Sequence, residues 1–201
     1  MNDVLKGYEA AATPDLIDRY EAISPLQLYE PVLDLLPDAP SRVADIGAGT
    51  GRDAAWMASK GHVVVAVEPV RAFRRAGLAL HGSTAIEWVD DSLPGLGKLS
   101  RHGRFDCVLL SAVWHHLDHA RRPEAIQALA GLTAPGGLLV MSLRHGPATP
   151  DRRVFDAAPD ETIGAARERG FSLVRRREAG SVQAANRSGG VRWTWLAFAM
   201  S

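Results

Sequence analysis

Apolar residues occur in short runs along this chain, and polar or glycine-rich turns separate them. Runs that are apolar on both faces, or alternate with period two, predict five strands, over 42–48, 62–67, 86–90, 105–111 and 137–143. Helical spacing between these runs predicts helices over 51–60, 70–81, 123–133 and 160–169. Strand and helix alternate because a parallel crossover needs a helix, so the pattern predicts an α/β fold with a doubly wound sheet.

Two further strands are expected near the end of the chain, over 171–178 and 191–199. No helix is predicted between them, which makes the last strand antiparallel and completes a Rossmann-like sheet of seven strands. The glycine- and serine-rich connection between them is wide for a hairpin, and we expect it to be mobile. Proline and glycine also predict irregular loops over 93–103 and 145–159.

The first forty residues show helical patterns and no strand. One helix is predicted over 15–23. Residues 24–27 read Ser-Pro-Leu-Gln, which suits a capping box with proline at the first helical position. This signal predicts a second helix from Pro25 to about Leu36, which Pro37 ends. We therefore divide the chain into a helical segment, 1–40, and a main domain, 41–201.

Composition narrows the class of protein. With 201 residues the chain fits one domain, and 23 basic residues balance 23 acidic ones, which argues against a broad nucleic-acid-binding face. Cys107, the only cysteine, lies in an apolar run, so we expect a buried thiol and a reducing compartment. No signal-peptide pattern and no apolar stretch of about 20 residues is present, so we expect a cytoplasmic protein without a membrane segment.

The first strand ends in a glycine-rich turn. Residues 43–51 read Val-Ala-Asp-Ile-Gly-Ala-Gly-Thr-Gly, with glycines at 47, 49 and 51, so a ligand can approach the backbone closely. The next strand closes on Glu68, whose carboxylate can accept both hydroxyls of a ribose. Together these features predict a site for a nucleoside-bearing cofactor.

Five motifs in this order resemble the class I S-adenosylmethionine-dependent methyltransferases, from about Ser41 to the end of the chain. They are the glycine turn 45–51, the acid Glu68, the acidic turn 91–94, the fourth-strand segment 105–117 and the turn 135–138. The main rival with this fold is a dinucleotide oxidoreductase, which carries Gly-x-Gly-x-x-Gly. Here the third glycine comes one residue early, at Gly51, and Arg52 stands in its place.

The resemblance implies how the methionine end of S-adenosylmethionine is held. Its methionyl portion would lie against Gly47, Ala48, Gly49 and Gly51. Asp45 would contact the methionine ammonium or shape the loop by an Asx-type hydrogen bond. Arg52 would pair with the methionine carboxylate, or remain an exposed arginine on the helix.

The resemblance also implies the nucleoside contacts. Glu68, with Pro69 beside it, would accept the ribose hydroxyls. Asp91, or its neighbour Asp90, would accept from the adenine amino group. The remaining implied contacts are Ser92 and Leu93 beside the ring, Ser111 and Ala112 under the sulfonium, and Tyr20 from the helical segment.

Residues 115–119 read His-His-Leu-Asp-His. Such a cluster suggests a metal site, but no distant partner set of Cys, His, Asp or Glu is evident, and we expect no metal. Histidine titrates near neutral pH, so His115 or His116 suits a general base facing the acceptor. A polar role in lining the loop is the alternative.

The expected reaction is methyl transfer to an O, N or C nucleophile of a small molecule, by a monomer or homodimer. The segment 1–40 would form a lid that shapes the acceptor site, with Tyr8, Tyr20 and Tyr29 in the pocket or in ordinary packing. Arg144 and His145 follow the fifth strand and suit an anionic or hydroxylated acceptor. The alternatives are a non-catalytic cofactor-binding subunit and a compact RNA or protein methyltransferase.

Overall fold

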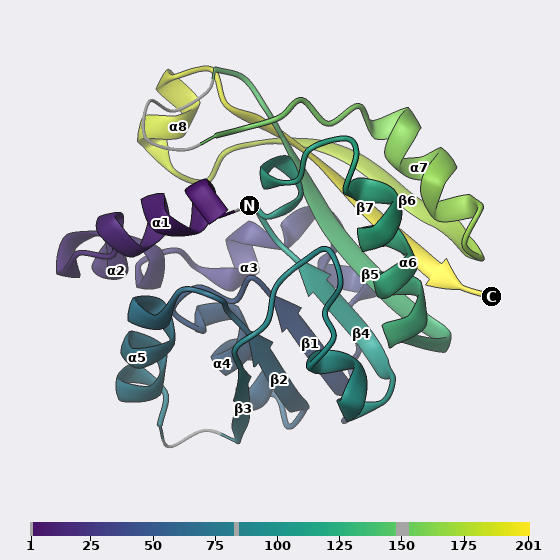
Figure 1. Ribbon diagram of the computed structural model, residues 1–201, viewed down its shortest axis with the longest axis horizontal. Helices are drawn as coiled ribbons and strands as arrows, with labels where there is room; N and C mark the ends of the chain where they lie inside the picture. The colour runs from purple at the N-terminus through teal and green to yellow at the C-terminus, as the bar shows by residue number, and fades with distance from the viewer. Residues whose placement is uncertain (1, 83–84, 148–152) are drawn as a thin grey trace.

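A computed structural model describes residues 2–82, 85–147 and 153–201, and these form one mixed sheet flanked by helices (Figure 1). The strand order is β3-β2-β1-β4-β5-β7-β6. Neighbours from β3 to β5 pair in parallel, whereas β7 runs antiparallel to both β5 and β6. The expected seven-stranded Rossmann-like sheet with an antiparallel last strand is confirmed. Its strands are β1 Arg42–Ile46, β2 Val63–Val67, β3 Ile86–Val89, β4 Phe105–Leu110, β5 Thr133–His145, β6 Phe171–Gly180 and β7 Arg192–Met200.

Helices cover both faces of the sheet. One face packs on α6 (Arg122–Leu132) and α7 (Pro159–Arg167), which lie in front of the sheet in Figure 1. The other packs on α4 (Arg52–Ser59) and on the 3-10 helix η1 (Glu30–Leu35). Val64 and Val65 of β2 belong to opposite core clusters. Burial on both faces explains why the central strands are nearly all apolar.

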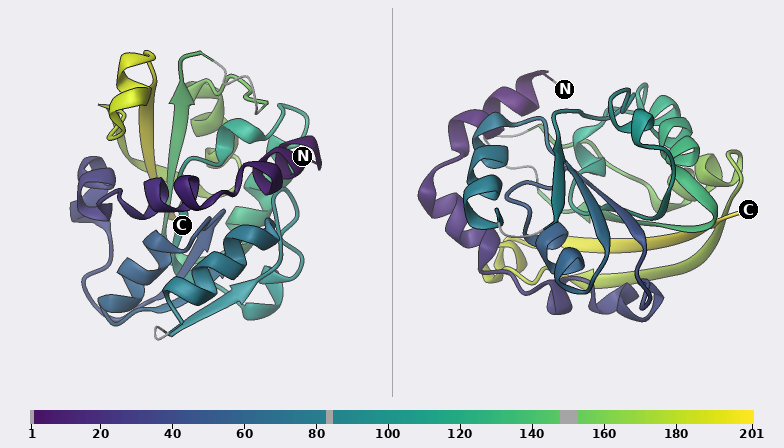
Figure 2. Two further views of the ribbon diagram at one scale, coloured as in Figure 1. Left: turned by 90° about the vertical axis from the view of Figure 1, so that its left-hand side faces the viewer. Right: turned by 90° about the horizontal axis from the view of Figure 1, so that it is seen from below.

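The amino-terminal helices pack away from these two cores. Helices α1 (Asn2–Ala11) and α2 (Pro14–Glu21) pack on α5 (Arg71–Leu80) through a small cluster that includes Leu16, Val70 and Phe73. Figure 2 shows α1 and α2 in front of the carboxyl ends of the central strands. Thr13 caps α2 by accepting a hydrogen bond from the Leu16 amide at 3.4 Å.

The single helix expected from Pro25 to Leu36 is wrong. The segment divides into α3 (Pro25–Leu28) and η1, and Pro31 lies at the start of η1. Proline has no N–H and its ring clashes with the carbonyl four residues earlier, so an α-helix cannot continue through it. The side chain of Ser24 makes no capping hydrogen bond, so the expected capping box is also wrong.

Three other local expectations need correction. The fifth strand begins at Thr133 rather than at residue 137, so it takes in the Pro-Gly-Gly turn. The predicted loop 93–103 contains a 3-10 helix, η2 (Leu99–His102). The connection between β6 and β7 contains the short helix α8 (Ala184–Ser188). Of the predicted loop 145–159, residues 148–152 lie outside the described part of the chain, and 153–158 form no regular element.

Cys107 is fully buried in β4, as expected. No helix within the described residues has both the length and the apolar character needed to cross a membrane.

Candidate functional site

A cavity of about 690 Å³ opens at the carboxyl ends of the central strands. This volume falls in the range of about 300–1,000 Å³ that is usual for small-molecule sites, and the location matches the rule for open α/β sheets. The residues that line it include the turns that follow β1, β2, β3 and β4, parts of β5, of β7 and of the segment 27–31, helices α1 and α2, Phe73 of α5, and the connection from β6 to β7.

The glycine turn after β1 is shaped for close backbone approach. Gly47 and Gly49 line the cavity with φ of 74° and 58°, in the left-handed region. A Cβ atom on Gly47 would come within 2.4 Å of the Val113 side chain. Ala48 lies between them and also lines the cavity.

Gly51 does not line the cavity, although the sequence predicted a cofactor contact there. It precedes α4 with φ of 84°, and a Cβ atom would meet the Trp88 ring at 2.7 Å. Its glycine character is therefore explained by the turn and by packing against Trp88.

Asp45 and Arg52 form a buried charged group with Asp53 behind the turn. The Arg52 guanidinium donates to both carboxylate oxygens of Asp53, at 2.7 and 2.9 Å, and to the Tyr20 carbonyl at 2.9 Å. Asp45 is 2% exposed, and its Oδ2 has no hydrogen-bond partner among the described residues. Burial, and then the nearby Asp53 carboxylate, hold the pKa of Asp45 well above its usual range. An ammonium group would satisfy this oxygen.

Glu68 lies directly beside the glycine turn and lines the cavity. Its carboxylate accepts hydrogen bonds from the amides of Gly49 and Val70, both at 2.8 Å. Burial nevertheless raises the pKa of Glu68 to about 7. Pro69 follows it along the cavity wall.

Asp91 and Asp90 lie in different environments. Asp91 lines the cavity with Ser92 and Leu93, whereas Asp90 is not among the lining residues and pairs with Arg74 at 3.0 Å. The Asp91 carboxylate accepts from the amide of Ser92 at 2.8 Å and from those of Lys98 and Leu99 at 2.7 and 2.9 Å. Asp91 therefore shapes the loop as well as facing the cavity.

The turn after β4 holds a strained residue. Ser111 and Ala112 line the cavity, and Ala112 has φ of 58°. The left-handed region costs an alanine roughly 1–2 kcal/mol. The Ala112 amide donates to the Ser142 hydroxyl at 2.8 Å, which helps to hold this conformation.

His115 and His116 both line the cavity, in a 3-10 turn, η3 (Trp114–His116). The Nδ1 atom of His116 lies 3.0 Å from the Arg153 carbonyl, and Nε2 lies 2.8 Å from the Tyr8 hydroxyl. A carbonyl only accepts, so Nδ1 carries the proton and Nε2 accepts from Tyr8. The His115 ring lies 4.1 Å from that of His116 and 5.8 Å from that of Trp193, centre to centre.

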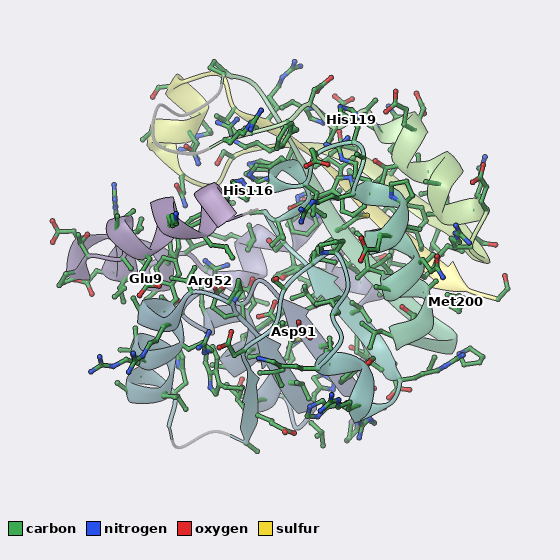
Figure 3. The ribbon with its side chains drawn as sticks, viewed as in Figure 1. Glu9, Arg52, Asp91, His116, His119 and Met200 are labelled. Carbon is green, nitrogen blue, oxygen red and sulfur yellow. The ribbon has the colours of Figure 1, made fainter. Side chains whose placement is uncertain are left out.

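His119 lies apart from this pair. Figure 3 shows His116 beside α1 and His119 away from it, and His119 contacts Glu161 of α7 at 3.8 Å. In the part of the chain that the structure describes, no three His, Cys, Asp or Glu side chains converge as a metal site would require.

The three tyrosines of the helical segment differ in whether they line the cavity. Tyr8 and Tyr20 line the cavity, and the Tyr20 ring packs on Phe73 at 5.7 Å. Tyr29 is fully buried outside it, where it stacks on Trp56 and donates to Asp53 at 3.0 Å. For these tyrosines the sequence left two possibilities, a place in the pocket or ordinary packing, and Tyr29 has the second.

Several lining residues were not predicted. Phe73, Val113, Trp193 and the segment 179–183 line the cavity. Their apolar pattern resembles that of any core strand or helix. The only available signal was their position near the carboxyl edge of the sheet, which depends on topology.

A sequence profile described as "Methyltransferase domain" matches residues 18–197. The chain belongs to this family. The matched range begins within α2. The expected class I methyltransferase family is confirmed, and the expected cofactor, S-adenosylmethionine, agrees with it.

An uncharacterized methyltransferase of Mycobacterium tuberculosis (strain H37Rv) is 34% identical to this methyltransferase domain over 130 residues. The match covers 61% of this chain and 48% of the relative, so the chain spans about half the length of the curated relatives that it matches.

Solved structures share the fold. The 1,6-didemethyltoxoflavin-N1-methyltransferase of Burkholderia thailandensis, with bound 1,6-didemethyltoxoflavin and S-adenosylhomocysteine, is 22% identical, with a TM-score of 0.74 over 98% of this chain and 88% of that chain. The N-methyltransferase NodS of Bradyrhizobium japonicum, in complex with S-adenosylhomocysteine, is 17% identical, with a TM-score of 0.67 over 92% and 97%.

Proposed function

We propose that this protein transfers a methyl group from S-adenosylmethionine to an O, N or C nucleophile of a small molecule. The observation that carries the proposal is one cavity that joins two kinds of surface. Gly49, Glu68 and Asp91 form a cradle suited to a nucleoside, and His115 and His116 face the same space.

The residues of the cradle suit the cofactor. The unpartnered oxygen of Asp45 suits the methionine ammonium, and the turn at Gly47 and Gly49 leaves room for the methionyl chain. Glu68 accepts the ribose hydroxyls, and the loop of Asp91 borders the adenine. When bound, S-adenosylmethionine supplies a methyl group that its sulfonium already activates.

The protein's remaining task is to align an acceptor and remove its proton. Alignment converts the transfer into an effectively unimolecular step. When the His116 imidazole is neutral, its Nε2 atom is the accepting nitrogen, so it can take a proton once an acceptor hydroxyl or amine replaces Tyr8 as its partner. His115, packed against His116, helps to position it.

The enclosure of the cavity supports a small acceptor. Helices α1 and α2 border it together with the β6–β7 connection, and the balanced charge offers no broad basic face to a nucleic acid. The Burkholderia enzyme holds 1,6-didemethyltoxoflavin together with S-adenosylhomocysteine, which favours the same class of acceptor here. A cytoplasmic location and a monomer or homodimer stay predictions.

Two measurements test the proposal. Isothermal titration calorimetry should show binding of S-adenosylmethionine and S-adenosylhomocysteine, and methyl-labelled cofactor should pass its label to a small-molecule extract. Tight binding of NAD in place of both ligands would refute the proposal. Cofactor binding with no labelled product would favour a non-catalytic cofactor-binding subunit, and label in RNA or protein would favour a macromolecular acceptor.

A further inference from the structure

Arg144, near the end of β5, places a buried positive charge on the cavity wall. The residue is 7% exposed and lines the cavity. Within the described part of the chain, its guanidinium makes one hydrogen bond, from Nη1 to the Gly146 carbonyl at 3.4 Å, which is long for such a bond. Among the described residues, no carboxylate oxygen lies within 4.0 Å of its guanidinium.

Other buried arginines of this chain have fuller sets of partners. Arg52 binds both oxygens of Asp53 and the Tyr20 carbonyl. Arg122, also 7% exposed, donates to the Asp156 carbonyl at 2.6 Å and faces the Trp114 ring. Burial lowers the pKa of Arg144, and the nearby Tyr8 hydroxyl is the one group that opposes this shift. A buried arginine that lacks a carboxylate partner and faces a cavity is suited to pair with an anion from a ligand.

The surroundings of Arg144 include a flat apolar wall. Arg144 is directly opposite Trp193 in the antiparallel pairing of β5 with β7, so the two side chains lie on the same face of the sheet. Trp193 also lines the cavity, and the His115 ring meets it edge to face. A planar group could pack on the indole while an attached anion reaches the guanidinium.

The position of Arg144 separates it from the cofactor cradle. Asp45 lies on β1, and β4 stands between β1 and β5 in the sheet. Two strand spacings amount to about 10 Å. Arg144 therefore lies near Trp193 and His115, away from Asp45 and the glycine turn.

We propose that Arg144 binds a carboxylate on a planar acceptor whose ring packs against Trp193. This inference rests on the proposed function and specifies the chemical class of its acceptor.

The test uses the full chain saturated with S-adenosylhomocysteine, with benzoate and the neutral benzamide as calorimetric probes. Benzoate should bind at least about tenfold more tightly than benzamide, since a charge-assisted pair is lost with the amide. Arg144→Gln should weaken benzoate by about tenfold or more, and Arg144→Lys should recover part of that loss. Arg122→Gln is the matched control: it alters an equally buried arginine outside the cavity and should leave the benzoate affinity unchanged.

The affinity for S-adenosylhomocysteine, measured on every variant, reports whether the protein is folded and where Arg144 acts. It should change by less than about twofold in Arg144→Gln. A loss of S-adenosylhomocysteine binding in Arg144→Gln, with Arg144→Lys and Arg122→Gln still binding it, would place the positive charge of residue 144 on the cofactor and overturn the inference. Equal affinities for benzoate and benzamide would overturn it as well.

A second measurement separates this inference from the proposed function. Labelled product formed from a small-molecule extract should be retained on an anion exchanger at pH above the carboxylate range. A labelled product that is neutral or cationic would overturn the anionic acceptor and leave methyl transfer intact. Failure of the protein to bind S-adenosylhomocysteine would instead count against the proposed function.

Discussion

At the scale of single residues, Glu68 combines burial with two hydrogen bonds from backbone amides, and burial dominates its titration. Arg74 lowers its pKa, and the carboxylates of Glu9 and Asp45 face it with the same charge. With a pKa of about 7, Glu68 gains and loses its proton in the physiological range. Ribose hydroxyls can donate only to an available lone pair, so they favour the ionised form.

We predict that S-adenosylhomocysteine binds more tightly as pH rises through 7. Below that value binding must release one proton from Glu68, so the dissociation constant should fall by up to about tenfold per pH unit and level off above it. Calorimetry between about pH 5.5 and 8.5 measures this slope. Glu68→Gln, which cannot ionise, should flatten it, and a slope that persists in this variant would assign the proton to another group.

The same proton has the opposite effect on folding. The pKa of Glu68 is about 7 in the folded chain against an ordinary 4.5, so protonation favours the folded state. We predict that the Glu68 contribution to the free energy of unfolding is fully present below about pH 4.5 and is lost as pH rises through 7. Urea titrations of the wild type and Glu68→Gln should diverge across this window, and parallel curves would contradict the prediction.

Cys107 is a second residue whose burial controls its chemistry. Burial raises the pKa of its thiol to about 12, so almost no thiolate forms at neutral pH. We predict that a thiol reagent labels Cys107 only as fast as the protein unfolds. The labelling rate should rise with urea in step with loss of circular dichroism, and rapid labelling in native buffer would contradict the prediction.

At the scale of elements, two glycines that flank α4 differ in one respect. Gly51 and Gly61 have φ of 84° and 89°, but a Cβ atom would strike Trp88 only at Gly51 and would meet nothing within 4 Å at Gly61. The pair therefore separates backbone strain from steric overlap.

We predict that Gly61→Ala lowers the free energy of unfolding by about 1 kcal/mol, from the left-handed backbone alone. Gly51→Ala should lower it by about 2–4 kcal/mol, because overpacking against Trp88 adds to the same strain. Chemical denaturation measures both. Equal losses in the two variants would show that the Trp88 contact is relieved without cost.

The sequence predicted best those elements whose apolar residues recur in a regular pattern. Apolar runs such as Val63–Val67 specify a strand buried on both faces, and their alternation with helices specifies the parallel part of the sheet. Pro31 could have indicated that the helix breaks there, but the apparent capping box at Ser24 favoured one continuous helix. The extension of β5 back to Thr133 depends on pairing with β4, which no local pattern reports.

The candidate site also contains residues that local sequence predicts and residues that only the fold places. Gly49 was predicted from the run of glycines that follows the first strand, and Glu68 from its position at the end of the second. Asp90 and Asp91 are adjacent, and only the fold decides which of them faces the cavity. The place of Trp193 depends on where β7 runs relative to β5, which is a property of the whole sheet.

At the scale of the whole molecule, three attachments hold the amino-terminal helices over the cavity. Tyr8 donates to His116, Glu21 accepts from Thr50 and contacts His81, and the Tyr20 carbonyl accepts from Arg52. They join α1 to the turn η3, and α2 to the start of α4 and the end of α5. The arrangement suits a lid that opens to admit ligands.

We predict that S-adenosylhomocysteine protects α1 and α2 from limited proteolysis, because they line the cavity that it fills. Tyr8→Phe removes one attachment and should speed cleavage in the absence of ligand. Mass spectrometry of early fragments locates the cuts. Cleavage that is insensitive to both the ligand and Tyr8→Phe would show that these helices are fixed parts of the domain.

The reversed direction of β7 also affects how the chain can diverge. Because β7 is antiparallel to β6, their connection returns to the edge where β5 ends, and His145 and Gly180 both pair with Arg192. The proposed acceptor wall thus combines the β6–β7 connection with residues from other parts of the chain, among them Tyr8, His116 and Arg144, whereas the proposed cofactor cradle is encoded over residues 45–93. If the proposed function holds, insertions or exchanges over 181–191 should change which acceptor is bound and leave the proposed cofactor cradle unaltered.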